Sequence, residues 1–271
     1  MNQGSLILTL IALNSSISFA APVTETVITA EQIIDRVIDR KNSRSEQVQV
    51  TMKVLTPSGK PREADRTFRM QASYSKSNDF KALLTFLLPI GIKSTKVLTV
   101  QEKGTTSQWI YLPSAKRVSR VNSDDDVDGV LDSDLSFSDL KSETNEDYNY
   151  TLNAGALEEY SAKMCAEPAY SITAESKVPG SSSYSKRVLS ISKAKFVICG
   201  IAVYDKDKKI VKNILNQNFS NIQNMWRPLL TTISSFKDGK TLSSRTLLQY
   251  AGWKVNARLD PGIFSVNNLE Q

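Results

Sequence analysis

Apolar and polar residues alternate along much of the chain, and this period of two predicts β-strands. The clearest case is residues 47–54, which lead through a turn at 57–60 into a return strand over 68–74. Further strands are predicted over residues 80–88, 96–101, 108–112, 148–152, 160–166, 184–191, 196–205, 210–218, 225–236, 241–251 and 255–259. We therefore expect one mainly antiparallel sheet of about ten strands, which is wide enough to curl.

Two helices are predicted beside the strands. Thr29-Ala-Glu-Gln32 is a capping box, and the apolar residues at positions 33, 34, 37 and 38 form one stripe of a helix. A short second helix is predicted over residues 136–142, with Ser136 as its N-cap and Asp139 at the third position.

Residues 80–88 are apolar on both faces of their strand, whereas a sheet with one solvated face would alternate more cleanly. We expect a mainly β (α+β) fold, in which a strongly curved antiparallel sheet forms an incomplete β-barrel capped by the N-terminal helix and the mid-chain helix. Its concave side would hold a helix as a plug or an apolar ligand. The side chains expected to line this cavity are Phe68, Met70, Leu84, Phe86, Leu98, Trp109 and Tyr111. A register error of one residue would move the whole set to the other face.

The composition narrows the chemistry. The chain has 271 residues, two cysteines and no histidine, which excludes a Ser-His-Asp triad, a Cys-His pair and any histidine-ligated metal or haem. No convergent polar cluster indicates catalysis, so we expect neither an enzyme nor a cofactor. Residues 124–129 match the first half of an EF-hand loop, but Leu135 stands where a bidentate glutamate is needed, so no metal is expected.

The net charge of +6 is unevenly distributed, because residues 124–147 contain ten acids and only one base, Lys141. The rest of the chain is correspondingly basic. Helix-turn-helix, zinc-finger and RNP patterns are absent from the sequence, so a nucleic acid partner is not expected. Peripheral contact with anionic membrane headgroups fits the charge better, and simple solubility is the alternative.

Residues 1–20 have an apolar core and a small-x-small site at Ser18-Phe-Ala20, as in a secretory signal peptide. We expect residues 21–271 to form a single exported domain. Cys165 and Cys199 would then meet an oxidising compartment, where a disulfide is permitted. If the strands predicted around them form a simple meander, a third strand separates the two thiols, so the pairing stays open.

Three stretches resemble the LolA-like outer membrane lipoprotein-sorting family. They are residues 109–120 (WIYLPSAKRVSR), 132–140 (DSDLSFSDL) and 259–269 (LDPGIFSVNNL), and residues 88–95 (LPIGIKST) add a weaker match. Ser94 and Asp132 stand where the family commonly has glycine. The motif residues expected to be structural are Pro113, Ser133, Asp134, Phe137 and Asp139.

The resemblance implies a periplasmic, non-enzymatic carrier in a Gram-negative bacterium, which shields a lipid, a lipoprotein acyl chain or other hydrophobic cargo on its way to the outer membrane. An inner-membrane transporter and an outer-membrane acceptor would be its partners, and a monomer is expected. Lys116, Arg117 and Arg120 would contact lipid phosphate or a partner's acidic patch, or else pair with the acidic segment downstream. The alternative is a docking or sensor subunit of a resistance-nodulation-division transporter, with a cavity filled by its own side chains.

Overall fold

The computed structural model describes Met1 and residues 28–41, 44–75, 79–103, 105–122, 129–142, 147–178 and 184–271. The predicted signal peptide and residues 124–128 of the acidic segment lie outside the described residues. Within them, no helix is long and apolar enough to cross a bilayer. The helices, in chain order and including 3-10 turns, are α1 (Ala30–Lys41), η1 (Ile90–Ile92), η3 (Phe137–Leu140), α2 (Ala156–Ala162), η4 (Pro261–Phe264) and η5 (Val266–Asn268). The strands are β1 (Ser45–Leu55), β2 (Arg66–Tyr74), β3 (Phe80–Leu88), β4 (Lys96–Glu102), β5 (Thr105–Leu112), β6 (Arg117–Arg120), β7 (Tyr148–Leu152), β8 (Ala169–Ser176), β9 (Lys186–Ser192), β10 (Ile198–Tyr204), β11 (Ile210–Gln217), β12 (Ser220–Ile222), β13 (Met225–Arg227), β14 (Leu230–Lys237) and β15 (Thr241–Val255).

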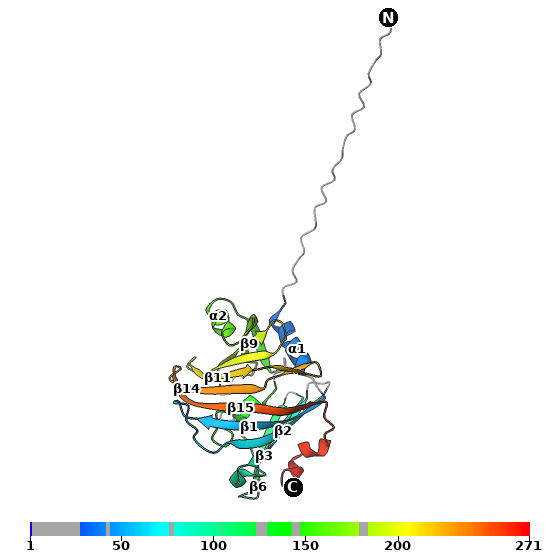
Figure 1. Ribbon diagram of the computed structural model, residues 1–271, viewed down its shortest axis with the longest axis vertical. Helices are drawn as coiled ribbons and strands as arrows, with labels where there is room; N and C mark the ends of the chain where they lie inside the picture. Colours follow the sequence, from blue (N-terminus) through cyan, green and yellow to red (C-terminus); the bar gives the residue numbers. More distant parts are fainter. Residues whose placement is uncertain are drawn as a thin grey trace.

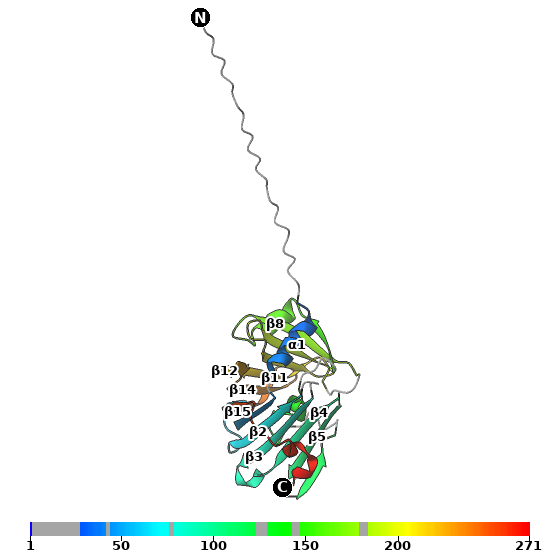
Figure 2. The ribbon, with the colours of Figure 1, turned by 90° about the vertical axis from the view of Figure 1, so that its right-hand side faces the viewer.

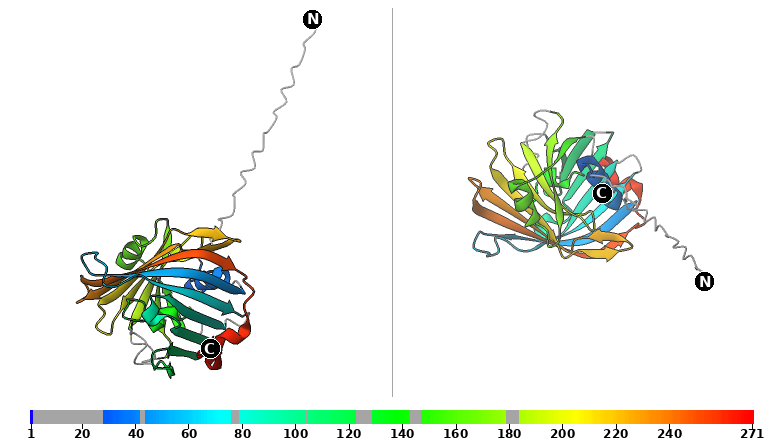
Figure 3. Two further views of the ribbon diagram at one scale, coloured as in Figure 1. Left: turned by 60° about the horizontal axis from the view of Figure 1, so that its bottom comes forward. Right: turned by 90° about the horizontal axis from the view of Figure 1, so that it is seen from above.

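Thirteen of these strands form one antiparallel sheet in the order β6-β5-β4-β3-β2-β1-β15-β14-β11-β10-β9-β8-β7 (Figure 1). The remaining two, β12 and β13, form a small hairpin. The large sheet curves strongly, as the view from above shows (Figure 3), and among the described strands β6 and β7 are edges that do not pair with each other. In its centre, β1 pairs with β15. The predicted incomplete antiparallel barrel with few helices is therefore confirmed.

Helix α1 fills the concave face over β7 to β10. Its predicted capping box is formed: the Thr29 backbone N–H donates to Gln32 Oε1 at 3.0 Å, and the Gln32 N–H donates to Thr29 Oγ1 at 3.3 Å. The apolar stripe of the helix is buried against the sheet, with Ile33 and Ile34 fully excluded from solvent. Figure 2 shows α1 against the upper part of the sheet, while the C-terminal segment lies at the lower end.

The segment 129–140 fills the concave face over the middle of the sheet. Its apolar side chains Val130, Leu135 and Phe137 are buried in one cluster with residues of β1, β2, β3, β11, β14 and β15. The predicted helix over 136–142 is present as the shorter 3-10 turn η3, and the expected capping box of Ser136 and Asp139 is formed. We call this segment the central plug.

The convex face carries two covers. Helix α2 packs over β8 and β9, and the C-terminal turns η4 and η5 place Phe264 and Leu269 against β3, β4 and β5. Because β3 and β4 are covered on both sides, their two faces are both apolar, and the alternation expected of a half-solvated sheet is absent.

Several predicted strands were wrong in detail. Residues 160–166 were predicted as a strand, but α2 and the turn after it occupy them, because Leu157, Tyr160 and Met164 present one apolar face to β9 and β10. The predicted strand 225–236 is divided between β13 and β14 at Pro228, which has no backbone N–H for a ladder. The strand predicted over 241–251 is longer and ends at Val255, whereas the strand predicted over 255–259 is absent beyond that residue. Strands β6, β8 and β12 were not predicted.

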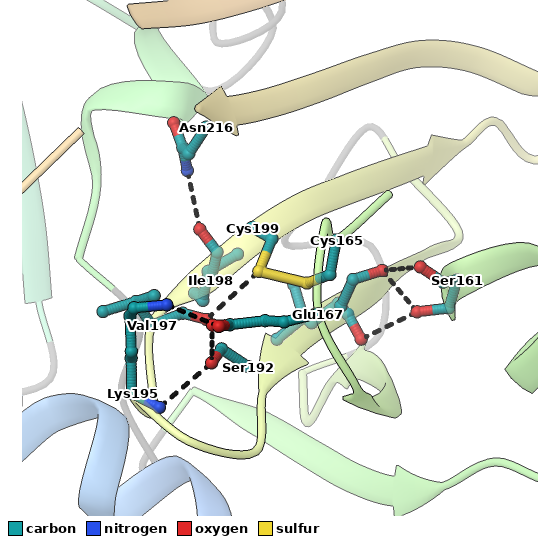
Figure 4. Close-up of a disulfide and its surroundings, with 11 residues drawn as sticks. Ser161, Cys165, Glu167, Ser192, Lys195, Val197, Ile198, Cys199 and Asn216 are labelled. Carbon is teal, nitrogen blue, oxygen red and sulfur yellow. Dashed lines mark hydrogen bonds and ion pairs between the residues drawn. A yellow bond between two sulfur atoms is a disulfide. The ribbon is translucent and has the colours of Figure 1, made fainter. Parts of the chain in front are cut away.

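Cys165 and Cys199 form a disulfide, with their Cα atoms 5.2 Å apart (Figure 4). Cys165 lies in the turn after α2 and Cys199 lies in β10, so the thiols meet through the helix that covers the sheet and not through neighbouring strands. Beside the bond, Glu167 pairs with Lys195 and accepts a hydrogen bond from Ser192. These two hydrogen bonds lower the pKa of Glu167 below its usual value, against a smaller opposing effect of burial.

The disulfide fixes α2 and its turn to the sheet, and its loss should be measurable. The bond spans 34 residues, and closing a loop of this size in the unfolded chain contributes about 3–4 kcal/mol. We expect the double variant Cys165→Ala/Cys199→Ala to lose roughly that free energy of unfolding in urea denaturation. Dithiothreitol should lower the stability of the wild type similarly and leave the variant unchanged; an equal effect on both proteins would contradict this account.

Ser94 and Asp132, which stand where the family commonly has glycine, both adopt left-handed backbone conformations, with φ of 67° and 55°. A side chain disfavours this region and glycine does not, so the family's glycines have a conformational reason. Ser94 is exposed in the turn between β3 and β4, and its backbone N–H donates to the Phe86 carbonyl at 2.8 Å. The turn is therefore kept despite the unfavourable residue.

Replacing Ser94 by glycine should relieve this backbone cost. We expect Ser94→Gly to raise the free energy of unfolding by about 1 kcal/mol in chemical denaturation. Ser114, an exposed turn residue without a positive φ, is the matched control: Ser114→Gly should be neutral or slightly destabilising, because there glycine only adds entropy to the unfolded chain. A gain of equal size at both sites would show that backbone conformation is not the cause.

Candidate functional site

A cavity of about 900 Å³ lies on the concave side of the sheet, bordered by α1 and the central plug. Its walls come from strands on both sides of the β1–β15 junction. They include residues of α1, β1, β2, β3, β5, β6, β7, β8, β9, β10, β11, β15, the central plug and the β12–β13 hairpin. Helix α1 and the central plug thus fill part of the concave face and leave a space of the size that holds small ligands in proteins.

One wall of the cavity is apolar. Met70 and Leu84 face it from β2 and β3, and Ile201 and Ile214 face it from β10 and β11. The same residues contact the main core cluster, so the wall continues the core and is held in place by it. Methionine and branched aliphatic side chains offer a surface without directional contacts, which suits a hydrocarbon ligand of variable shape.

Aromatic side chains close the part of the cavity near the β12–β13 hairpin. Phe219, Trp226 and Trp253 line it. Trp253 is fixed, because its Nε1–H donates to the Pro228 carbonyl at 3.1 Å and its ring stacks on Tyr250 at 5.5 Å between centroids. Burial raises the pKa of Tyr250 and so keeps the phenol neutral. The hydrogen bond to Thr231 has a smaller, opposing effect on this pKa.

A buried ion pair joins this hairpin to β1. The Arg227 Nε–H donates to both carboxylate oxygens of Glu46 at 3.0 Å, and the two side chains are 9% and 3% exposed. Burial, together with the nearby Glu46 charge, raises the pKa of Tyr74. Because the pair is desolvated, loss of either side chain would leave the other charge buried without compensation. The pair thereby also holds Trp226, the neighbour of Arg227, at the cavity wall.

A second buried ion pair joins the central plug to β11. Lys212 Nζ lies 2.7 Å from Asp139 and donates to Ser136 Oγ at 2.9 Å, with the Lys212 and Asp139 side chains 7% and 10% exposed. Burial acts to lower the pKa of Lys212, but the charge and hydrogen bonds of Asp139 and Tyr184 outweigh it, so the pKa is raised. The lysine therefore remains charged and fixes the turn that carries Asp139.

The other motif residues of the plug also have positional contacts. Asp134 is buried and accepts hydrogen bonds from Thr246 at 2.8 Å and from Ser244, while its own backbone N–H donates to Thr246 Oγ1 at 2.9 Å. Ser133 Oγ donates to the Val130 carbonyl at 2.8 Å. The suggested pairing of these acids with Arg117 or Arg120 is wrong for Asp139, whose cation is Lys212.

Polar and charged side chains gather at the part of the cavity that faces the sheet edges. Arg120 lines it and donates to Ser107 Oγ at 3.1 Å. Arg187 also lines it, with its guanidinium 4.4 Å from the centroid of Tyr148. An apolar wall with a polar border can accept an amphiphile, whose chain is buried while its head stays hydrated.

Only some of the residues predicted to line the cavity do so. Met70 and Leu84 line the cavity. Phe68 and Phe86 share their face, but their rings lie 5.1 Å apart in the core under the central plug. Leu98, Trp109 and Tyr111 lie on the convex face beneath the C-terminal segment, so their assignment is corrected. An apolar face was not diagnostic here, because this part of the sheet is covered on both sides.

The predicted basic strip is likewise divided. Arg120 reaches the cavity border, whereas Lys116 and Arg117 are exposed at the turn between β5 and β6. Pro113 begins that turn, and its carbonyl accepts the Lys116 N–H at 3.2 Å. Of the acidic segment with which these bases could alternatively pair, residues 124–128 and 143–146 lie outside the described residues.

The ion pairs on the concave side were not predicted. Glu46 shares the buried face of β1 with Val48 and Val50, and Lys212 shares that of β11 with Ile214. A charge at an apolar position of an alternating strand is a usable signal, because burial there requires a partner. The partners Asp139 and Arg227 could not be inferred, since they come from distant segments.

The site has features of binding and none that indicate a metal. Within the described ranges no group of three or more acids and cysteines could hold a metal ion. The buried charges described above form ion pairs, and apolar and aromatic side chains line much of the cavity. The arrangement can enclose a hydrophobic molecule by burial of apolar surface.

These features define an open antiparallel barrel with a plugged concave face, which is the LolA-like fold. A family model described as "Uncharacterized protein" matches residues 78–271, and the chain belongs to that family. No curated protein matches the chain significantly. The identification therefore rests on the family model for membership and on solved structures for the fold.

Three solved structures are similar over almost their whole length. A putative outer membrane lipoprotein-sorting protein domain from Vibrio parahaemolyticus is 20% identical, with a TM-score of 0.78 over 90% of this chain and 98% of that one. A DUF1329 family protein from Desulfovibrio piger is 19% identical, with a TM-score of 0.76 over 89% and 99%. A LolA superfamily protein from Nitrosomonas europaea is 17% identical, with a TM-score of 0.64 over 89% and 99%. At these identities the likeness shows a shared fold.

The Lys212–Asp139 pair should be essential to the position of the central plug. We expect Lys212→Met to lower the free energy of unfolding by about 3–5 kcal/mol, because it leaves Asp139 buried without its cation. The double variant Lys212→Met/Asp139→Asn should lose clearly less, since no uncompensated charge remains. Denaturant titration of both variants checks this, and a double variant as unstable as the sum of its single changes would contradict it.

Proposed function

We propose that the protein is a non-enzymatic carrier that binds the acyl chain of a lipid or lipoprotein, or a similar hydrophobic cargo, in the concave cavity. The observation that carries the proposal is the cavity itself. It has a volume of about 900 Å³, an apolar wall and an aromatic end, and it lies between α1 and the central plug. Each buried methylene of a cargo chain would contribute about 0.8 kcal/mol. The cavity therefore has both the volume and the surface that a lipid chain requires.

The carrier would act in the periplasm of a Gram-negative bacterium, as a single domain after removal of its signal peptide. The apolar core of residues 1–20 and the disulfide both suit an exported protein. The Vibrio structure is named a putative outer membrane lipoprotein-sorting protein domain. In this function an inner-membrane transporter would load the carrier and an outer-membrane acceptor would unload it.

The alternative, a docking or sensor subunit of such a transporter, expects a cavity filled by the protein's own side chains. Residues of α1 and the central plug fill only parts of the concave face, and the space between them remains. This observation favours carriage. Native mass spectrometry of protein purified from the periplasm tests the proposal directly, and the absence of both co-purified lipid and fatty-acid uptake would refute it.

Filling part of the cavity should weaken binding without damage to the fold. Met70 faces the cavity, whereas its neighbour Arg69 is exposed on the outer face of the same strand. We expect Met70→Trp to weaken uptake of a fluorescent fatty acid by about tenfold, a loss equal to that of roughly two buried methylenes. Arg69→Trp, which adds the same ring outside, should bind normally. Equal binding by both variants would place the cargo elsewhere.

A further inference from the structure

The turn between β3 and β4 exposes two large apolar side chains at its tip. Leu88 is 56% exposed and Ile90 is 80% exposed, and among the large apolar residues of the described chain only Met1 and Val178 (62%) are also more than half exposed. Isolated apolar residues at a surface are common, but two on one short turn form a distinct apolar tip. We call Leu88 and Ile90 the apolar tip.

The tip is held outward by a well-bonded turn. The Ile92 N–H donates to the Pro89 carbonyl at 3.1 Å, and the Ser94 N–H donates to the Phe86 carbonyl at 2.8 Å. Ile92 is directed inward and packs against the main core cluster, and Thr95 is buried. One apolar residue of the turn therefore secures it, while the apolar tip remains in solvent.

Basic side chains surround the tip. The strand registers place the turns 56–65, 89–95 and 113–116 at the same end of the sheet, because Thr67 pairs with Leu88 and Leu112 pairs with Arg117. The exposed bases of these turns and of the start of β6 are Lys60, Arg62, Lys93, Lys116 and Arg117. The acids of the same turns, Glu63 and Asp65, form ion pairs with Arg66 and Lys53. These turns therefore carry more exposed basic than acidic side chains.

We propose that this end of the molecule docks on the surface of an anionic phospholipid bilayer, with the apolar tip inserted among the headgroups and the surrounding bases in contact with phosphate. Insertion of a few apolar side chains combined with electrostatic attraction is sufficient for peripheral binding. A protein partner is less suited, because a stable interface buries about 800 Å² on each side and this tip offers two side chains.

The docking surface is separate from the cavity. The residues of β3 that line the cavity end at Leu84, before the tip begins at Leu88. Bilayer binding and cargo binding can therefore be disabled independently, and the docking proposal stands or falls without the carrier proposal.

Flotation with phospholipid vesicles tests the docking surface on the full chain without its signal peptide. We expect binding to vesicles of phosphatidylcholine with phosphatidylglycerol, little binding to phosphatidylcholine alone, and weakening by salt. The variants Leu88→Ser/Ile90→Ser and Lys116→Glu/Arg117→Glu should each weaken binding by about tenfold or more. Because all four side chains are exposed, both variants should keep the melting temperature of the wild type.

Two controls make the result specific. Leu152→Ser changes an apolar residue, 41% exposed, at the edge strand β7, and should bind vesicles like the wild type. Met70→Trp should show weakened fatty-acid uptake and keep vesicle binding. Ile90→Trp should show a blue-shifted emission on anionic vesicles, as expected of a ring that leaves water. No binding to anionic vesicles, or full binding by Leu88→Ser/Ile90→Ser, would overturn the proposal. In the second case, a protein partner that binds this turn would be the remaining explanation of its exposed apolar residues.

Discussion

The structure depends on one geometric constraint: a sheet of thirteen strands that curves without closing cannot fill its own concave face. Something must cover the apolar side chains that point inward, and this chain uses two inserts from different parts of its sequence. Helix α1 covers one side and the central plug 129–140 covers the middle. The cavity is the space that remains between them. Its size therefore depends on how completely these two separate segments cover the concave face of the sheet.

Polar contacts fix the central plug where apolar packing alone would allow it to slide. Lys212 holds Asp139 from β11, and Thr246 holds Asp134 from β15. Burial of these polar groups costs desolvation free energy. It also fixes the position of the central plug, because only one placement satisfies every donor and acceptor. An apolar cavity beside a mobile insert would collapse; beside an insert held by buried polar groups, it can stay open. This explains why a protein whose core is otherwise apolar keeps charged groups inside.

Local signals predicted the parts of the fold that depend on neighbouring residues. The bounds of β3 and β7 and the capping box of α1 follow from alternation and from cap chemistry. What failed depended on distant contacts. Residues 160–166 alternate well enough for a strand, but packing on β9 and β10 makes the start of this stretch helical. Trp109 and Tyr111 were assigned to the cavity because nothing in a strand's own pattern says which face the C-terminal segment will cover.

The pairing of β1 with β15 has a consequence for how the molecule forms. The strand that begins the sheet in the sequence finds its neighbour near the other end of the chain, with Glu46 opposite Val255. The two halves of the sheet can each pair locally, but they can join only after nearly all of the polypeptide is present. Long-range pairing of this kind slows folding and leaves strand edges unpaired for longer. Until the C-terminal strands are present, the edge of β1 is open to any other strand, so that edge must be protected while the chain is synthesised and folds.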